Sequence, residues 1–152
     1  MIFAIDPGTT KSGWVLFDGV SVLDSGVDDN HDLLRWVQNG QHADILAIEM
    51  IANMGMAVGR SVFETVRWIG RFQQAWRDPE LVRLIYRAEV KMALCGSMRA
   101  RDANVRQALL DRFAHTGGGR VPQVGTVRHP GPLYGVSSHA WSALAVAVVA
   151  MG

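Results

Sequence analysis

Two short apolar runs, each ended by a carboxylate, most constrain the fold of this chain. Residues 2–5 (IFAI) precede Asp6, and residues 45–48 (ILAI) precede Glu49. Such runs predict buried β-strands, and the PGTT turn after Asp6 leads to a hairpin partner over residues 14–17. A buried strand hosts an unpaired carboxylate only at a cost in free energy. If the two strands are neighbours, both acids lie at one sheet edge, where a carboxylate pair binds a hard cation such as Mg²⁺ through oxygen.

Length and composition indicate one domain. With 152 residues, 49% of them hydrophobic, we expect residues 1–152 to form a single domain. Cys95 is the only cysteine, which excludes an internal disulfide or a cysteine-based zinc site and favours a cytoplasmic location. The apolar run at 143–151 is shorter than the roughly 20 residues that span a bilayer. We therefore expect neither a membrane segment nor a signal peptide.

Charge is distributed unevenly along the chain. Residues 1–49 contain eight acidic and two basic residues, whereas residues 50–113 contain eleven basic and six acidic ones. The first part could hold a metal ion while the second meets the phosphates of a nucleic acid. The alternative is that these charges only solvate helix faces, and charge by itself favours that alternative.

The periodicity of apolar residues predicts alternating strands and helices. Strands are expected over 2–5, 14–17, 21–26, 44–49 and 81–86, and helices over 32–39, 58–76, 88–94, 102–113 and 138–151. In the long helix over 58–76, Val62, Val66 and Phe72 belong to an apolar stripe, and Arg60 lies on the opposite face. This order of elements predicts an α/β fold in which helices flank a mixed sheet.

Five motifs, taken in order, resemble those of one nuclease family. They are AIDPGTTKSGW, LAIEM, EVKMALCGS, RDANVRQALLDRF and GVSSHAWSALAVA. Their order and spacing over nearly the whole chain resemble RuvC-like Holliday junction resolvases of the RNase H-like superfamily, in a phage-type branch. The resemblance implies an RNase H-like mixed five-stranded sheet flanked by helices. It also implies a homodimeric, metal-dependent endodeoxyribonuclease that cuts four-way DNA junctions.

The resemblance also implies a metal site. Asp6 would bridge two Mg²⁺ or Mn²⁺ ions, Glu49 would bind one of them, and His139 stands where the family places an acid or histidine. The family usually carries a further carboxylate three residues later, where this chain has Ser142. Asp102 is our candidate to supply the missing carboxylate, although it could instead be the N-cap of its helix.

Each of these residues also has a structural interpretation. Asp6 could cap the turn that follows it, because Asp is common before Pro-Gly in loops. Glu49 could pair with an arginine of the long helix. His139 could be a hydrogen-bonded surface group, or it could accept a proton from water, since histidine titrates near about pH 6.5.

Basic and apolar side chains supply candidate DNA contacts. Lys91 matches a lysine position of the family and is the first candidate for a phosphate contact near the cleaved bond, where it would assist catalysis. In the loop after Glu49, an apolar side chain could wedge against an unstacked base. The further candidates are Arg60, Arg99 and Arg101 for phosphates and Met54 and Met56 for the wedge. The alternatives are solvated helix faces for the charged residues and core or dimer contacts for the methionines.

Three other functions share features with this sequence. The segment DPGTTKSGW resembles the first phosphate loop of actin-type and sugar kinases, but the chain is too short for their two domains, so no nucleotide cofactor is expected. A non-cleaving module that binds nucleic acid could use the same fold. A nuclease of this fold could also act on RNA or on RNA–DNA hybrids.

Overall fold

The sheet has five strands with mixed direction. The computed structural model describes residues 1–40, 43–53 and 55–152. Its strands are β1 (Ile2–Asp6), β2 (Lys11–Phe17), β3 (Val22–Asp29), β4 (Ile45–Met50) and β5 (Arg83–Tyr86). They lie in the order β3-β2-β1-β4-β5, in which β3, β2 and β1 are antiparallel and β1, β4 and β5 are parallel. The predicted α/β fold, with a mixed five-stranded sheet flanked by helices, is confirmed.

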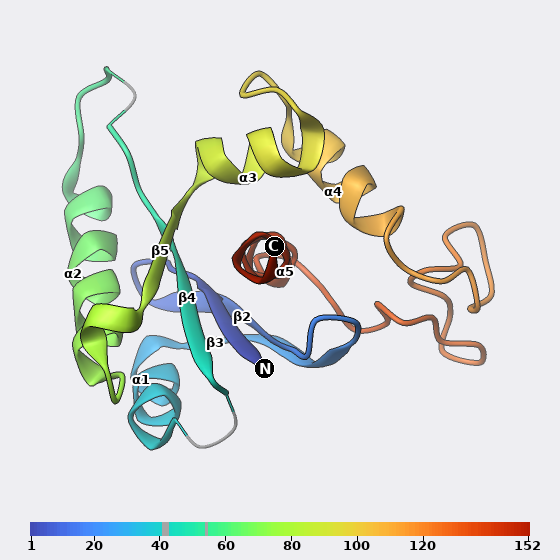
Figure 1. Ribbon diagram of the computed structural model, residues 1–152, viewed down its shortest axis with the longest axis horizontal. Coiled ribbons are helices and arrows are strands. Elements are labelled where there is room, and N and C mark those ends of the chain that lie inside the picture. Colours follow the sequence, from blue (N-terminus) through green and yellow to red (C-terminus); the bar gives the residue numbers. More distant parts are fainter. Residues whose placement is uncertain (41–42, 54) are drawn as a thin grey trace.

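Helices cover both faces of this sheet. They are α1 (Asn30–Asn39), α2 (Arg60–Ala75), α3 (Arg87–Cys95), α4 (Asp102–Leu110) and α5 (Ala140–Met151). Figure 1 shows α1 and α2 on one side of the sheet, and α5, flanked by α3 and α4, on the other. None of the helices in the described ranges is long and apolar enough to cross a membrane.

Strand alternation explains why both faces are covered. In β1, Ile2 and Ala4 pack in the core on the α5 side, whereas Phe3 and Ile5 pack in the core on the side of α1 and α2. Successive side chains of a strand point to opposite faces, so a strand that is apolar at every position needs a cover on each face. Helix α5 is itself buried along nearly its whole length. Its lack of a polar face places it in the interior.

Several element boundaries differ from the prediction. Strand β3 continues to Asp29, whose carboxylate accepts a hydrogen bond from the His31 backbone N–H at 2.8 Å and caps α1. Helix α4 ends at Leu110, because the next turn tightens, and Phe113 bonds back to the Leu110 carbonyl while remaining buried. A 3₁₀ turn at Pro79–Leu81 delays the start of β5 to Arg83.

The apolar stripe predicted for the long helix is buried only in its C-terminal half. Helix α2 meets the sheet through Thr65, Ile69 and Phe72, which are its buried residues. Val66, which belongs to the predicted stripe, is 37% exposed, and Phe63 is 60% exposed. The helix therefore presents apolar side chains on its outer surface.

Candidate active site

Asp6 and Glu49 lie side by side at the carboxyl ends of two central strands. Strands β1 and β4 are parallel neighbours, with Ile5 opposite Ile48, so the two acids are the next residues in register. Each acid lies two residues beyond an alanine of the core on the α5 side, so strand alternation directs both toward α5. Their carboxyl groups are hydrogen-bonded to each other. Each side chain is only 14% exposed.

His139 reaches this pair from the start of α5. Its Nδ1 lies 2.9 Å from Oδ2 of Asp6, and its side chain is 69% exposed. The preceding Ser138 has a φ of 49°, a left-handed conformation that no other non-glycine residue adopts in the described ranges. This turn before the helix aims the histidine back at the end of β1.

Gly13 makes room for that approach. It pairs with Asp6 across the β1–β2 hairpin, and a Cβ atom placed on it would lie 2.3 Å from the carbonyl carbon of His139. Only glycine lets the backbone at the start of α5 lie this close to β2. Sequence reasoning did not single out Gly13, although a glycine inside a strand is the signal for such a close approach.

A buried polar network fixes the turn that follows Asp6. The Ser12 hydroxyl donates to Oδ1 of Asn30 at 2.6 Å and accepts from the Gly8 N–H at 3.1 Å. The Asn30 amide donates to the Gly8 carbonyl at 2.9 Å. Ser12 and Asn30 are at most 1% exposed, so these bonds are shielded from water and hold the turn rigidly. Sequence reasoning also missed this pair, because it joins residues far apart in the chain.

Burial and like charge dominate the electrostatics of the two acids. Burial raises the pKa of Glu49, and its hydrogen bond with Asp6 raises it further, to about 8. Burial also raises the pKa of Asp6, while the bond from Glu49 and the charge of Arg87 oppose that rise. The shared proton therefore resides on Glu49. A pair of acids that retains a proton near neutral pH is typical of a cation-binding or catalytic site.

The raised pKa predicts that stability falls with rising pH. Between about 4.5 and about 8 the folded protein keeps a proton on Glu49 that the unfolded chain has lost. This group's contribution to the free energy of unfolding is therefore complete below about pH 4.5 and is lost as the pH rises to about 8. In EDTA, the melting temperature of the wild type should fall from pH 5 to pH 8.5. Glu49→Gln should flatten that fall, the exposed Glu80→Gln should not, and equal slopes for all three proteins would contradict the assignment.

Arg87 is the residue that sequence analysis missed most clearly. It begins α3, and its guanidinium lies between two acids, with Nη1 3.8 Å from Oε1 of Glu49 and Nη2 bonded to Oδ1 of Asp102. That bond to Arg87 lowers the pKa of Asp102. Arg87 lies four residues before Lys91, a spacing that puts both on one helix face, which was the available signal.

The structural roles predicted as alternatives for Glu49 and Asp102 are wrong in detail. Glu49 does pair with an arginine, but Arg87 belongs to α3 and not to the long helix α2. Asp102 is not the N-cap of α4, because Arg101 occupies that position and Asp102 is the first residue of the helix. Its carboxylate is 86% exposed and raises the pKa of both Asp6 and Glu49 through its charge. Asp102 thus lies at the outer side of the same cluster.

The remaining predicted residues lie at different distances from the cluster. Lys91 is partly buried on α3, and its charge helps to lower the pKa of Asp102. Arg99 and Arg101 are exposed in the connection from α3 to α4. Arg60 forms an ion pair with Glu64 at 2.8 Å near the start of α2. Met56 is 74% exposed, and the prediction for Met54 falls outside the described residues.

The donor atoms at Asp6 and His139 fit one divalent ion. Their separation of 2.9 Å is that of adjacent ligands at right angles around an octahedral ion with ligand distances of about 2.1 Å. Within residues 1–40, 43–53 and 55–152, no three His, Cys, Asp or Glu side chains form a ready metal cage. Glu49, which is hydrogen-bonded to Asp6, is the candidate third ligand, and it would have to move as well as lose its proton to join the other two.

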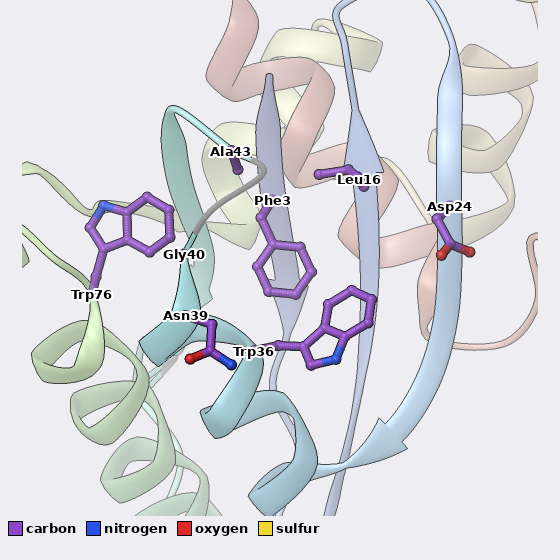
Figure 2. A pocket seen from close by; sticks show the side chains of 8 residues that line it. All are labelled: Phe3, Leu16, Asp24, Trp36, Asn39, Gly40, Ala43 and Trp76. Atoms are coloured by element: carbon purple, nitrogen blue, oxygen red, sulfur yellow. The ribbon is translucent and has the colours of Figure 1, made fainter.

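Two cavities differ in their relation to the acids. One cavity, of about 540 Å³, lies on the side of α1, and neither Asp6 nor Glu49 lines it. Figure 2 shows its lining side chains, which include Phe3, Trp36 and Trp76. The second, of about 380 Å³, lies between α3, α4 and α5 and is lined by Arg87 and Ser142 among others. The second cavity therefore adjoins the acidic cluster, and the larger one does not.

Comparison with solved structures identifies the same fold. The chain resembles "T. thermophilus RuvC in complex with Holliday junction substrate" with a TM-score of 0.64 and 20% identity, over 97% of this chain and 90% of that one. A second Thermus thermophilus RuvC structure matches with a TM-score of 0.63 and 18% identity, over 97% and 91%. No family model matches the chain, and no curated protein matches its sequence. At this identity the likeness establishes the fold of RuvC for this chain.

Proposed function

We propose that this protein is a divalent-metal-dependent endodeoxyribonuclease that resolves four-way DNA junctions. The observation that carries the proposal is the contact of Asp6 with both Glu49 and His139 at the carboxyl edge of the central strands. It occurs in a chain whose fold is that of RuvC, one structure of which contains a Holliday junction substrate. We further propose that residues 1–152 form one domain.

Each site residue has its own role in the proposed hydrolysis of a phosphodiester. A divalent ion held by Asp6, Glu49 and His139 would supply positive charge beside the phosphate and acidify water. Asp6 orients the imidazole of His139 through the 2.9 Å contact. As a ligand through Nδ1, His139 would not also be the general base, because its Nε2 would then carry the ring proton and could accept no other. Glu49 must lose its proton before it can bind the ion.

One experiment tests the substrate and the chemistry together. The protein is incubated with labelled four-way junction, linear duplex and RNA–DNA hybrid, each with Mg²⁺, Mn²⁺ or EDTA. The expected result is symmetrical cutting of the junction with either metal and no cutting in EDTA. Equal cutting of the junction and the linear duplex would contradict the proposed specificity for junctions. Cutting of the hybrid alone would identify a ribonuclease of the same fold.

A non-cleaving role in junction binding is the second candidate. Arg87 already pairs with Glu49 and Asp102, and Ser142 adds no carboxylate to the cluster. Both features reduce the negative charge that would hold metal. Tight binding of the junction without cutting in either metal would select this candidate.

Lys91 is proposed to contact a phosphate of the DNA. It lies on α3 near Asp102 and is one helical turn from Arg87. Each phosphate that a protein neutralises releases about one counterion from the DNA on binding. Lys91→Gln should therefore make the slope of the log of the DNA-binding constant against the log of the salt concentration less steep by about 0.9. Arg35→Gln, on the opposite face of the sheet, is the control. If Lys91→Gln changes neither this slope nor the cleavage rate, Lys91 is a solvated surface residue without a phosphate contact.

We also propose that the protein acts as a homodimer. Resolution of a junction requires two cuts, and each chain supplies one acidic cluster. The exposed Phe63 and Val66 on the outer face of α2 offer apolar surface for a contact between two copies. The expected mass in light scattering is that of two chains.

A further inference from the structure

The feature that the proposed nuclease reaction does not use is the guanidinium of Arg87. Arg87 follows β5 by one residue, and Ile85 of β5 packs in the core on the α5 side. Strand alternation therefore carries Arg87 to the same face as Asp6 and Glu49. Its Nη1 is the one buried side-chain nitrogen or oxygen atom in the described part of the chain that has no hydrogen-bond partner. Burying a charged donor atom without a hydrogen-bond partner costs free energy, so we expect the guanidinium to have a function at this position.

Charge around the cluster supplies that reason. Asp6, Glu49 and Asp102 contribute three carboxylates when ionised, and Arg87 contributes one positive charge that no accessible pH removes. The formal charge is then −2, which a single divalent ion neutralises. Position 142 is a serine and adds no charge. A second divalent ion would therefore leave an excess of positive charge beside Asp6 and Glu49, whose side chains are only 14% exposed.

The position of Arg87 also disfavours a second ion. The cavity of about 380 Å³ beside the cluster is lined by Arg87, Asp102, Ser138 and Ser142. A second ion bound by Glu49 on this side would lie next to the guanidinium, which is 3.8 Å from Oε1 of Glu49. The positive charges of that ion and of the guanidinium would repel each other.

We propose that Arg87 is a tethered cation that takes the place of a second metal ion, so that each chain binds one divalent ion at Asp6, Glu49 and His139. The proposal rests on the nuclease function proposed above and departs from the two ions implied by the family resemblance. Arg87 is a positioning residue here: it balances the charge of Glu49 and Asp102 and restricts the metal to the side of Asp6.

Counting bound Mn²⁺ tests the proposal without measuring cleavage. Equilibrium dialysis with Mn²⁺, read by electron paramagnetic resonance, should give one ion per chain for the wild type. Arg87→Lys keeps the charge and should also bind one. Arg87→Met combined with Ser142→Asp leaves four carboxylates and no cation, and should bind two ions whose spectrum is broadened by their coupling at about 4 Å.

The outcomes separate this inference from the proposed function. Two ions in the wild type, or one in a folded double variant, would overturn the role of Arg87 while leaving the nuclease intact. No bound Mn²⁺ in the wild type would overturn both. Circular dichroism shows whether each variant is folded, and if the double variant is not, the wild-type count decides by itself.

Discussion

Asp6→Asn is expected to reduce the rate of junction cleavage by about a thousandfold or more, which corresponds to about 4 kcal/mol of transition-state stabilisation. The Asp6 carboxylate contacts both Glu49 and His139, so its loss removes the group that joins the other two. An amide of the same shape cannot supply the charge that binds a divalent ion. Single-turnover kinetics with saturating Mg²⁺ measures the effect.

The fold should tolerate this change. Asparagine ends the repulsion between two buried carboxylates, so the melting temperature in EDTA at pH 8 should stay constant or rise. Asp32→Asn is the matched control, because Asp32 is an exposed acid on α1, across the sheet from the cluster. Cleavage by Asp6→Asn at the wild-type rate would place the metal site elsewhere.

Gly13→Ala is expected to have the second largest effect, on stability and on the site together. The new methyl group would lie 2.3 Å from the carbonyl carbon and 2.6 Å from Cβ of His139. Backbone atoms cannot move aside as a flexible side chain can, so the start of α5 must shift. Overpacking of this kind costs about 1–3 kcal/mol, or roughly 2–10 °C in melting temperature for a domain of this size.

The same shift should move His139 away from Asp6. We expect Mn²⁺ affinity to fall at least about tenfold, the range seen when the orientation of a metal ligand is lost. Gly152→Ala at the other end of α5 is the control, because its nearest contacts would be at 3.8 Å, an ordinary packing distance. Should Gly13→Ala retain both its melting temperature and its Mn²⁺ affinity, Gly13 would have no role in placing the histidine.

Local patterns predicted most of the fold. A strand was expected near each of the five observed strands, and the order of the elements predicted the mixed sheet flanked by helices that the structure has. Boundaries were less accurate, as at β3, which runs three residues beyond the predicted end at 26. Pairing with β2 extends it, since Lys11 pairs with Asp29. Cross-strand pairing of this kind involves residues that no local window contains.

How much of the apolar stripe on the long helix is buried could not be predicted, for a related reason. Periodicity identifies the apolar face of a helix but not how much of that face a neighbour covers. In α2, Ile69 and Phe72 reach the core, while Phe63 and Val66 stay exposed. Where a helix meets a sheet depends on the position of both elements, which the helix sequence does not contain.

By itself, the sequence determined which residues end the buried strands, and so which acids could meet at one sheet edge. That information is local, because it depends on apolar runs and on the polar residue that follows each. Tertiary structure alone decided that Gly13 admits His139 to Asp6, and that Arg87 lies between Glu49 and Asp102. These contacts join segments far apart in the chain, and their energies depend on burial and on distances that exist only after folding.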